Sequence, residues 1–180
     1  VMTAMSDAAK MGVMVKGAKY FESFAKADTI VFDKTGTLTE AQPRLACVLT
    51  TDGWSEDEIL RLSACLEEHF PHPVARAVVN AARERGLEHR ERHAAVEYIV
   101  AHGIASSIEG RRAIIGSAHF VFEDEGAQLE SDIKERIESQ MQGLSPLYLA
   151  VDGTVVGVLG IEDPLKPGVR ETIADLHALG

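Results

Sequence analysis

Long apolar runs are missing from this sequence of 180 residues. The best stretch, Thr154 to Ile161, has the length of a strand and contains two glycines, whereas a membrane-spanning helix needs about 20 apolar residues. No basic-then-apolar leader opens the chain, which begins at Val1. We therefore expect a soluble, cytosolic-type piece of a longer protein.

Cations and cysteines are also scarce. Lys and Arg number 18 against 28 Asp and Glu, and the formal net charge of −10 argues against nucleic acid as a partner. The two cysteines, Cys47 and Cys65, form no CxxC pair, which indicates buried thiols in a reducing compartment. Hydrophobic residues at 46% and charged residues at 26% are typical of a folded globular protein and exclude a disordered chain.

The middle of the chain, residues 41–160, has the pattern of an antiparallel sheet with helices. Ser55 and Glu58 form a capping box, Pro73 suits the first position of a second helix, and Asp152-Gly153 is a type I′ hairpin signal. A further helix is predicted over 128–142. The predicted strands are 45–50, 96–101, 104–109, 111–115, 147–151 and 154–161.

The two ends of the chain have a different pattern from the middle. Residues 3–27 are predicted to be helical with an irregular exit, Thr29–Asp33 is predicted to be a buried parallel strand, and Gly168–Leu179 a helix. One parallel strand cannot pair its own backbone, so residues 1–40 and 161–180 indicate an incomplete α/β domain. The overall expectation is an α/β (α+β) chain in which the middle domain is an insertion.

The loop after the predicted strand is Asp33-Lys34-Thr35-Gly36-Thr37-Leu38-Thr39. A carboxylate at the carboxyl end of a strand, followed by glycine and hydroxyl residues, suits phosphoryl transfer through an attacking aspartate and a divalent cation. The alternative is an ordinary turn in which Asp33 caps a neighbouring element.

DKTGTLT resembles the phosphorylation motif of P-type ATPases, within the haloacid dehalogenase-like superfamily. The resemblance implies a Rossmann-type phosphorylation domain in which Asp33 becomes the aspartyl phosphate. Asp33 and the Thr35 carbonyl would hold Mg²⁺, and Lys34 and Thr37 would contact phosphate. Hydrolases of the superfamily usually carry a second Asp at the position of Thr35, so its absence favours a transport cycle over a fast phosphatase.

His72-Pro73 resembles the His-Pro motif of the heavy-metal branch of these ATPases. The resemblance implies that His72 orients the nucleotide and that Glu67 meets the adenine amino group, while the alternative for His72 is a plain helix cap. Two further turns are similar to nucleotide-contacting turns of the family. The first ends at Gly103, with Ala101 in place of its first glycine, and the second contains Gly116 and Ser117. Asp163 resembles the family's hinge aspartate.

The resemblance implies ATP and Mg²⁺ as cofactors. It implies the remaining phosphorylation, actuator and transmembrane domains of a pump as partners, a heavy-metal cation as cargo, and a place at the cytoplasmic face of a membrane. We expect the chain alone to bind nucleotide without turnover. The alternatives are a soluble phosphohydrolase with a cap domain, and a nucleotide-sensing module. His89 and His93 have metal-ligand spacing but read better as a solvated face.

Overall fold

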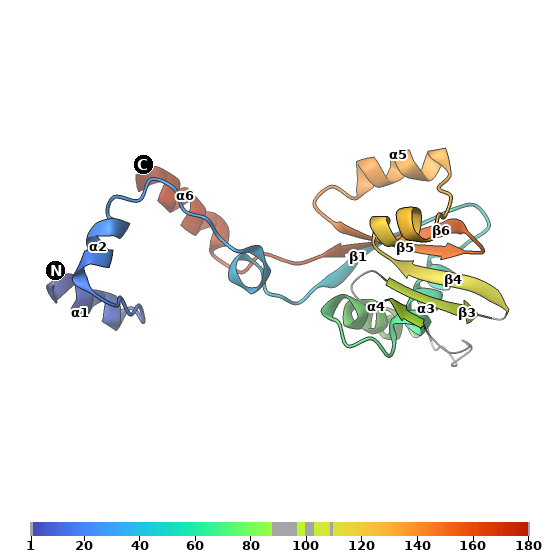
Figure 1. Ribbon diagram of the computed structural model, residues 1–180, viewed down its shortest axis with the longest axis horizontal. Coiled ribbons are helices and arrows are strands. Elements are labelled where there is room, and N and C mark those ends of the chain that lie inside the picture. The colour runs from blue at the N-terminus through green and yellow to red at the C-terminus, as the bar shows by residue number, and fades with distance from the viewer. Residues whose placement is uncertain (1, 88–96, 100–102, 109, 180) are drawn as a thin grey trace. The chain divides into compact units, whose positions relative to one another are not determined.

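The computed structural model describes residues 2–87, 97–99, 103–108 and 110–179 (Figure 1). The chain forms two compact units. The terminal unit consists of Val1–Leu38 and Pro167–Gly180, and the central unit consists of Thr39–Lys166. Each unit is described by itself.

The central unit is built on a six-stranded antiparallel sheet with the strand order β1-β6-β5-β4-β3-β2. Its strands agree in place and type with the sequence prediction, although only three residues of the second strand are described. They are β1 (Arg44–Thr50), β2 (Glu97–Ile99), β3 (Gly103–Ile108), β4 (Arg111–Gly116), β5 (Ser145–Val151) and β6 (Thr154–Glu162).

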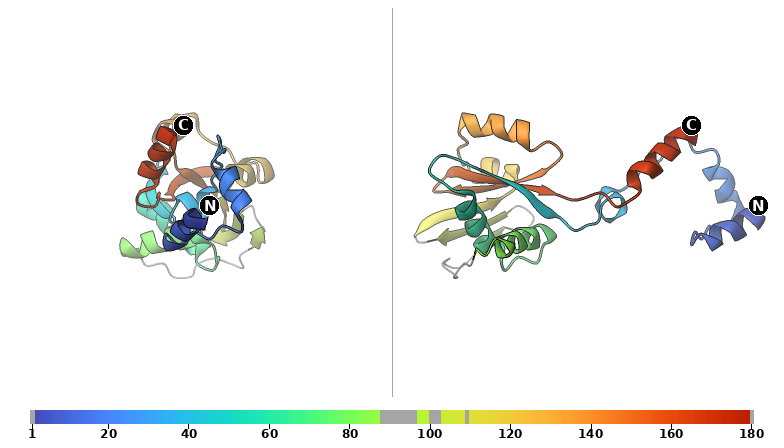
Figure 2. Two further views of the ribbon diagram at one scale, coloured as in Figure 1. Left: turned by 90° about the vertical axis from the view of Figure 1, so that its left-hand side faces the viewer. Right: turned by 180° about the vertical axis from the view of Figure 1, so that it is seen from behind.

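Helices cover both faces of this sheet (Figures 1 and 2). On one face α3 (Glu56–Glu67) and α4 (Pro73–Glu84) bury Ile59, Leu60 and Val78 against the strands. On the other face α5 (Ser131–Gln140) and the single-turn segment η2 (His119–Asp124) bury Ile133 and Phe120. The result is a three-layer unit with one apolar core on each side of the sheet.

Local signals in the sequence explain where these elements begin and turn. The Ser55 side chain and the Glu58 side chain cap each other's backbone amides, as the capping box predicts. Pro73 occupies the first turn of α4, where its missing N–H costs nothing. Asp152 and Gly153 have φ values of 49° and 81°, and two consecutive positive φ angles are the mark of a type I′ hairpin.

The terminal unit corrects two predictions. The helix expected over 3–27 is two helices, α1 (Met2–Lys10) and α2 (Ala18–Phe24), because Gly12 (φ 78°) and Gly17 (φ 139°) lie between them in conformations that break a helix. The buried strand expected at Thr29–Asp33 is absent, and Val31 is 90% exposed. No strand of the described residues pairs with this segment, and an unpaired strand does not form.

The C-terminal helix α6 (Val169–Leu179) is formed as predicted. Across the described ranges, no helix is both long and apolar enough to cross a bilayer. Of the predicted buried thiols, Cys65 is buried and Cys47 is only half-buried. The altered turn at Ala101 and the histidine pair His89 and His93 lie outside the described residues.

Candidate functional site

A pocket of about 220 Å³ in the central unit brings together five residues that the sequence singled out, from four different elements. Glu67 ends α3, His72 caps α4, Gly103 begins β3, Gly116 ends β4 and Ser117 follows it. The remaining walls are mainly apolar. They are formed by Phe70, Val74, Ile104, Ile115 and Leu147.

Glu67 is the acid of this pocket. The residue is only 5% exposed, and in the described part of the chain its carboxyl makes no hydrogen bond or ion pair. Burial disfavours the charged form and raises the pKa of Glu67 from 4.5 to about 7. Near neutral pH a large share of the carboxyl is therefore protonated, and in that form it can both donate and accept a hydrogen bond.

His72 is the N-cap of α4 and also faces the pocket. Its Nδ1 accepts a hydrogen bond from the backbone N–H of Val74 at 3.3 Å, so in the neutral ring the proton sits on Nε2. The ring lies near-parallel to that of Phe70, with 5.8 Å between centroids and 24° between planes. His72 is therefore a helix cap whose ring also lines the pocket, and its contact with a nucleotide stays a prediction.

Gly103 and Gly116 are directly paired neighbours on β3 and β4. A Cβ on Gly103 would collide with the Phe120 ring and lie 2.6 Å from the Ile115 carbonyl oxygen. The resemblance implied that the turn ending at Gly103 contacts the nucleotide. Internal packing by itself therefore requires glycine at position 103, and the nucleotide contact stays a prediction.

Ser117 is exposed and sits at the mouth of the pocket. Its Oγ accepts a hydrogen bond from the backbone N–H of Phe120 at 3.3 Å, and its carbonyl accepts from Val121 N–H at 3.0 Å. The side chain thus secures the start of η2, and its hydroxyl hydrogen can still be donated to a ligand.

The Asp33 loop belongs to the terminal unit. Lys34–Leu38 forms a kinked turn, and Thr35 (φ −75°, ψ 120°) followed by Gly36 (φ 77°, ψ −12°) has the angles of a type II turn. The positive φ explains why glycine stands at the third place after the aspartate. Asp33, Lys34, Thr35 and Thr37 are all exposed.

Asp163 lies outside the pocket, where the chain leaves the central sheet. Thr39 Oγ1 donates a 2.6 Å hydrogen bond to Asp163 Oδ2, and the Glu40 N–H donates to the Pro164 carbonyl at 2.9 Å. Thr39 is 1% exposed, and Asp163 Oδ1 is buried without a partner among the described residues. The segment that enters the central unit at Thr39 and the segment that leaves it at Asp163, here called the crossing segments, are therefore held together by two hydrogen bonds. Thr39 was not singled out from the sequence, although it ends the DKTGTLT motif.

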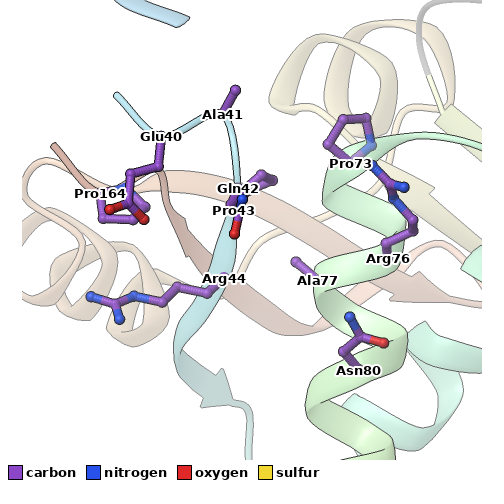
Figure 3. A pocket seen from close by; sticks show the side chains of 10 residues that line it. All are labelled: Glu40, Ala41, Gln42, Pro43, Arg44, Pro73, Arg76, Ala77, Asn80 and Pro164. Carbon is purple, nitrogen blue, oxygen red and sulfur yellow. The ribbon is translucent and has the colours of Figure 1, made fainter. Parts of the chain in front are cut away.

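A second and larger cleft of about 540 Å³ was also missed (Figure 3). One wall is the crossing segment Glu40–Arg44 with Pro164, and the other is the α4 surface of Pro73, Arg76, Ala77 and Asn80. Arg44 is engaged by Glu162 through a 2.5 Å contact. No group of three or more His, Cys, Asp or Glu side chains suited to a metal occurs among the residues described.

A family model described as haloacid dehalogenase-like hydrolase matches residues 27–180. The chain belongs to this family. Within it, the chain is 36% identical over its whole length to the copper-exporting P-type ATPase of Legionella pneumophila, of which it covers 24%. This member of the haloacid dehalogenase-like family therefore spans about a quarter of the length of that relative.

Solved structures give the same relationship for this haloacid dehalogenase-like chain. A zinc-transporting P-type ATPase aligns with all of the chain and 29% of its own, at 27% identity and a TM-score of 0.73. The N-domain of a copper-transporting P-type ATPase aligns with 67% of the chain and 99% of its own, at 27% identity and a TM-score of 0.55. The chain is thus homologous to the nucleotide-binding and phosphorylation segments of heavy-metal P-type ATPases.

Proposed function

We propose that the chain is the nucleotide-binding domain of a heavy-metal-translocating P-type ATPase, residues 41–160, with flanking pieces of the phosphorylation domain, residues 1–40 and 161–180. The observation that carries the proposal is the convergence of Glu67, His72, Gly103, Gly116 and Ser117 on one pocket. The compact unit Thr39–Lys166 supports the proposed domain boundaries.

The pocket suits the adenine end of ATP. Its volume of about 220 Å³ lies below the roughly 300–1,000 Å³ typical of pockets that enclose a whole ligand, so it fits the base better than the complete nucleotide. The His72 ring can stack on the purine, and the Glu67 carboxyl can meet the exocyclic amino group. Ser117 can donate its hydroxyl hydrogen to the ribose or to a phosphate.

The Asp33 loop suits the transfer step. A carboxylate oxygen of Asp33 attacks the γ-phosphorus, the bond from that phosphorus to the β,γ-bridging oxygen breaks, and ADP leaves with the electron pair. Lys34 and Thr37 bind oxygens of the transferred group. The product is an aspartyl phosphate on Asp33.

Mg²⁺ fits the donors that this loop offers. The Asp33 carboxylate and the Thr35 carbonyl are hard oxygen ligands, and Mg²⁺ is commonly held by one or two protein ligands together with substrate phosphates and water. When bound, the ion neutralises charge on the phosphate oxygens. Thr35 supplies no carboxylate to activate water, so the aspartyl phosphate persists until another part of the pump assists its hydrolysis.

In the intact protein, this phosphorylation cycle would move a heavy-metal cation across a membrane, with the chain at the cytoplasmic face and the transmembrane, actuator and remaining phosphorylation domains as partners. One similar protein is named for copper and another for zinc, so we propose a heavy-metal cation as the cargo and do not specify the metal. A phosphohydrolase with a cap domain is less well supported, because the relative matched over the whole chain is a pump.

An ATP titration followed by residue-resolved NMR tests the proposal. We expect shifts at Glu67, His72, Gly103 and Gly116 that are stronger with ATP than with GTP, and about tenfold weaker ATP binding by His72→Gln. The matched control is His69→Gln, an exposed histidine that does not line the pocket. Unchanged affinity in a folded His72→Gln variant, or steady ATP hydrolysis that Asp33→Asn abolishes in this chain, would refute the corresponding part of the proposal.

A further inference from the structure

We infer that the cleft beside α4 receives the phosphate chain of the nucleotide, and that Arg76 is the side chain that positions it. The inference rests on the proposed function, because it starts from a base held in the pocket of Glu67 and His72. It adds a path for the phosphates and a residue that distinguishes a nucleotide from a nucleoside.

The linings of the two cavities meet in the first turn of α4. His72 and Val74 line the pocket, whereas Pro73, between them in sequence, lines the cleft. The backbone N–H of Arg76 donates to the carbonyl of His72 at 3.1 Å, which places Arg76 one helical turn after His72. A ligand that leaves the pocket past the His72 ring therefore meets the α4 wall of the cleft.

The charges that line the cleft favour the α4 wall as the phosphate site. Figure 3 shows the Arg76 side chain bent back along α4, with its guanidinium beside Pro73. Arg76 is exposed and has no ion pair within the described ranges, whereas the other cation of the cleft, Arg44, is held by Glu162. Glu40 lies on the opposite wall next to Pro164 and repels an anion there.

The volumes of the two cavities and the donor geometry of the Arg76 guanidinium also favour this assignment. The pocket of about 220 Å³ accommodates a base, and the open cleft of about 540 Å³ has room for an extended polar chain. A guanidinium presents paired N–H donors that match two phosphate oxygens, and the positive end of the α4 dipole adds to the attraction. The Asn80 amide, one turn further along α4, lines the same wall.

The test compares ATP, ADP and adenosine binding by the 180-residue chain and by Arg76→Gln and Arg76→Lys. Because the site is exposed, we expect Arg76→Gln to weaken ATP binding by about two- to fivefold and adenosine binding not at all, with Arg76→Lys in between. The matched control is Arg85→Gln, at the other end of α4, where the side chain pairs with Glu56 and Asp57.

Two results would overturn the inference and leave the proposed function intact. One is wild-type ATP binding that Arg76→Gln does not change. The other is an equal loss of ATP and adenosine affinity in a variant whose NMR spectrum shows a folded chain, because that pattern reports a damaged base pocket. A wild-type chain that binds no ATP would instead overturn the proposed function, and the inference with it.

Discussion

Replacing Glu67 with glutamine should make the central unit more resistant to unfolding at alkaline pH. Glutamine has the shape of the protonated acid and cannot become charged. The Glu67 side chain is almost fully buried and has no hydrogen-bond or ion-pair partner within the described residues, so its ionised form is destabilised in the folded state alone.

The magnitude follows from the pKa of Glu67, which burial raises from 4.5 to about 7. Because the folded state holds the proton more tightly, the free energy of unfolding falls as pH rises between these two values. The full effect is about 3 kcal/mol, since each pKa unit corresponds to 1.36 kcal/mol. Between about pH 5.5 and 8.5 the wild type should lose about 2 kcal/mol that Glu67→Gln does not lose.

Urea unfolding followed by the fluorescence of Trp54, the single tryptophan, reports on the central unit. The free energy of unfolding falls by about 1–3 kcal/mol per molar urea, so a difference of about 2 kcal/mol moves the midpoint of the unfolding transition by about 0.7–2 M urea. Glu84→Gln, at an exposed position of α4, is the matched control and should follow the wild type. Parallel pH curves for wild type and Glu67→Gln would refute the reasoning.

Two further predictions concern packing and the crossing segments. Gly103→Ala should lower the free energy of unfolding by about 1–3 kcal/mol, because the new Cβ would collide with the Phe120 ring. In a double-mutant cycle, the loss in the Gly103→Ala/Phe120→Leu double variant should differ from the sum of the two single losses. Simple additivity would contradict the contact. Thr39→Val should leave both oxygens of Asp163 unpaired and cost about 1–3 kcal/mol, with faster hydrogen exchange at the Glu40 amide, which bonds to Pro164. Unchanged exchange at that amide would contradict the tie between the crossing segments.

Short-range signals were sufficient for most of the central unit. The Ser55 capping box, Pro73 at a helix start and the Asp152-Gly153 turn each act over four residues or fewer, so they could be read without knowledge of the fold. The same holds for the DKTGTLT string, whose Gly36 occupies the positive φ that its turn requires.

Predictions that depended on partners distant in the chain fared worse. The apolar pattern of Thr29–Asp33 is that of a strand, yet no strand forms, because backbone pairing comes from a neighbouring strand and none is present among the described residues. Nor could the sequence show that Gly103 packs against the Phe120 ring, which comes from the turn after β4, while its role as a nucleotide contact stays a prediction.

By itself the sequence determined which elements the central unit has and the turns that join them, and it predicted the chemistry of the Asp33 loop, because these depend on residues close together in the chain. Only the tertiary structure decided that Glu67, His72 and Gly116 share one pocket, that Thr39 binds Asp163, and that Arg76 faces a cleft. The raised pKa of Glu67 was likewise decided by the tertiary structure, because it results from burial among segments that are distant in the sequence.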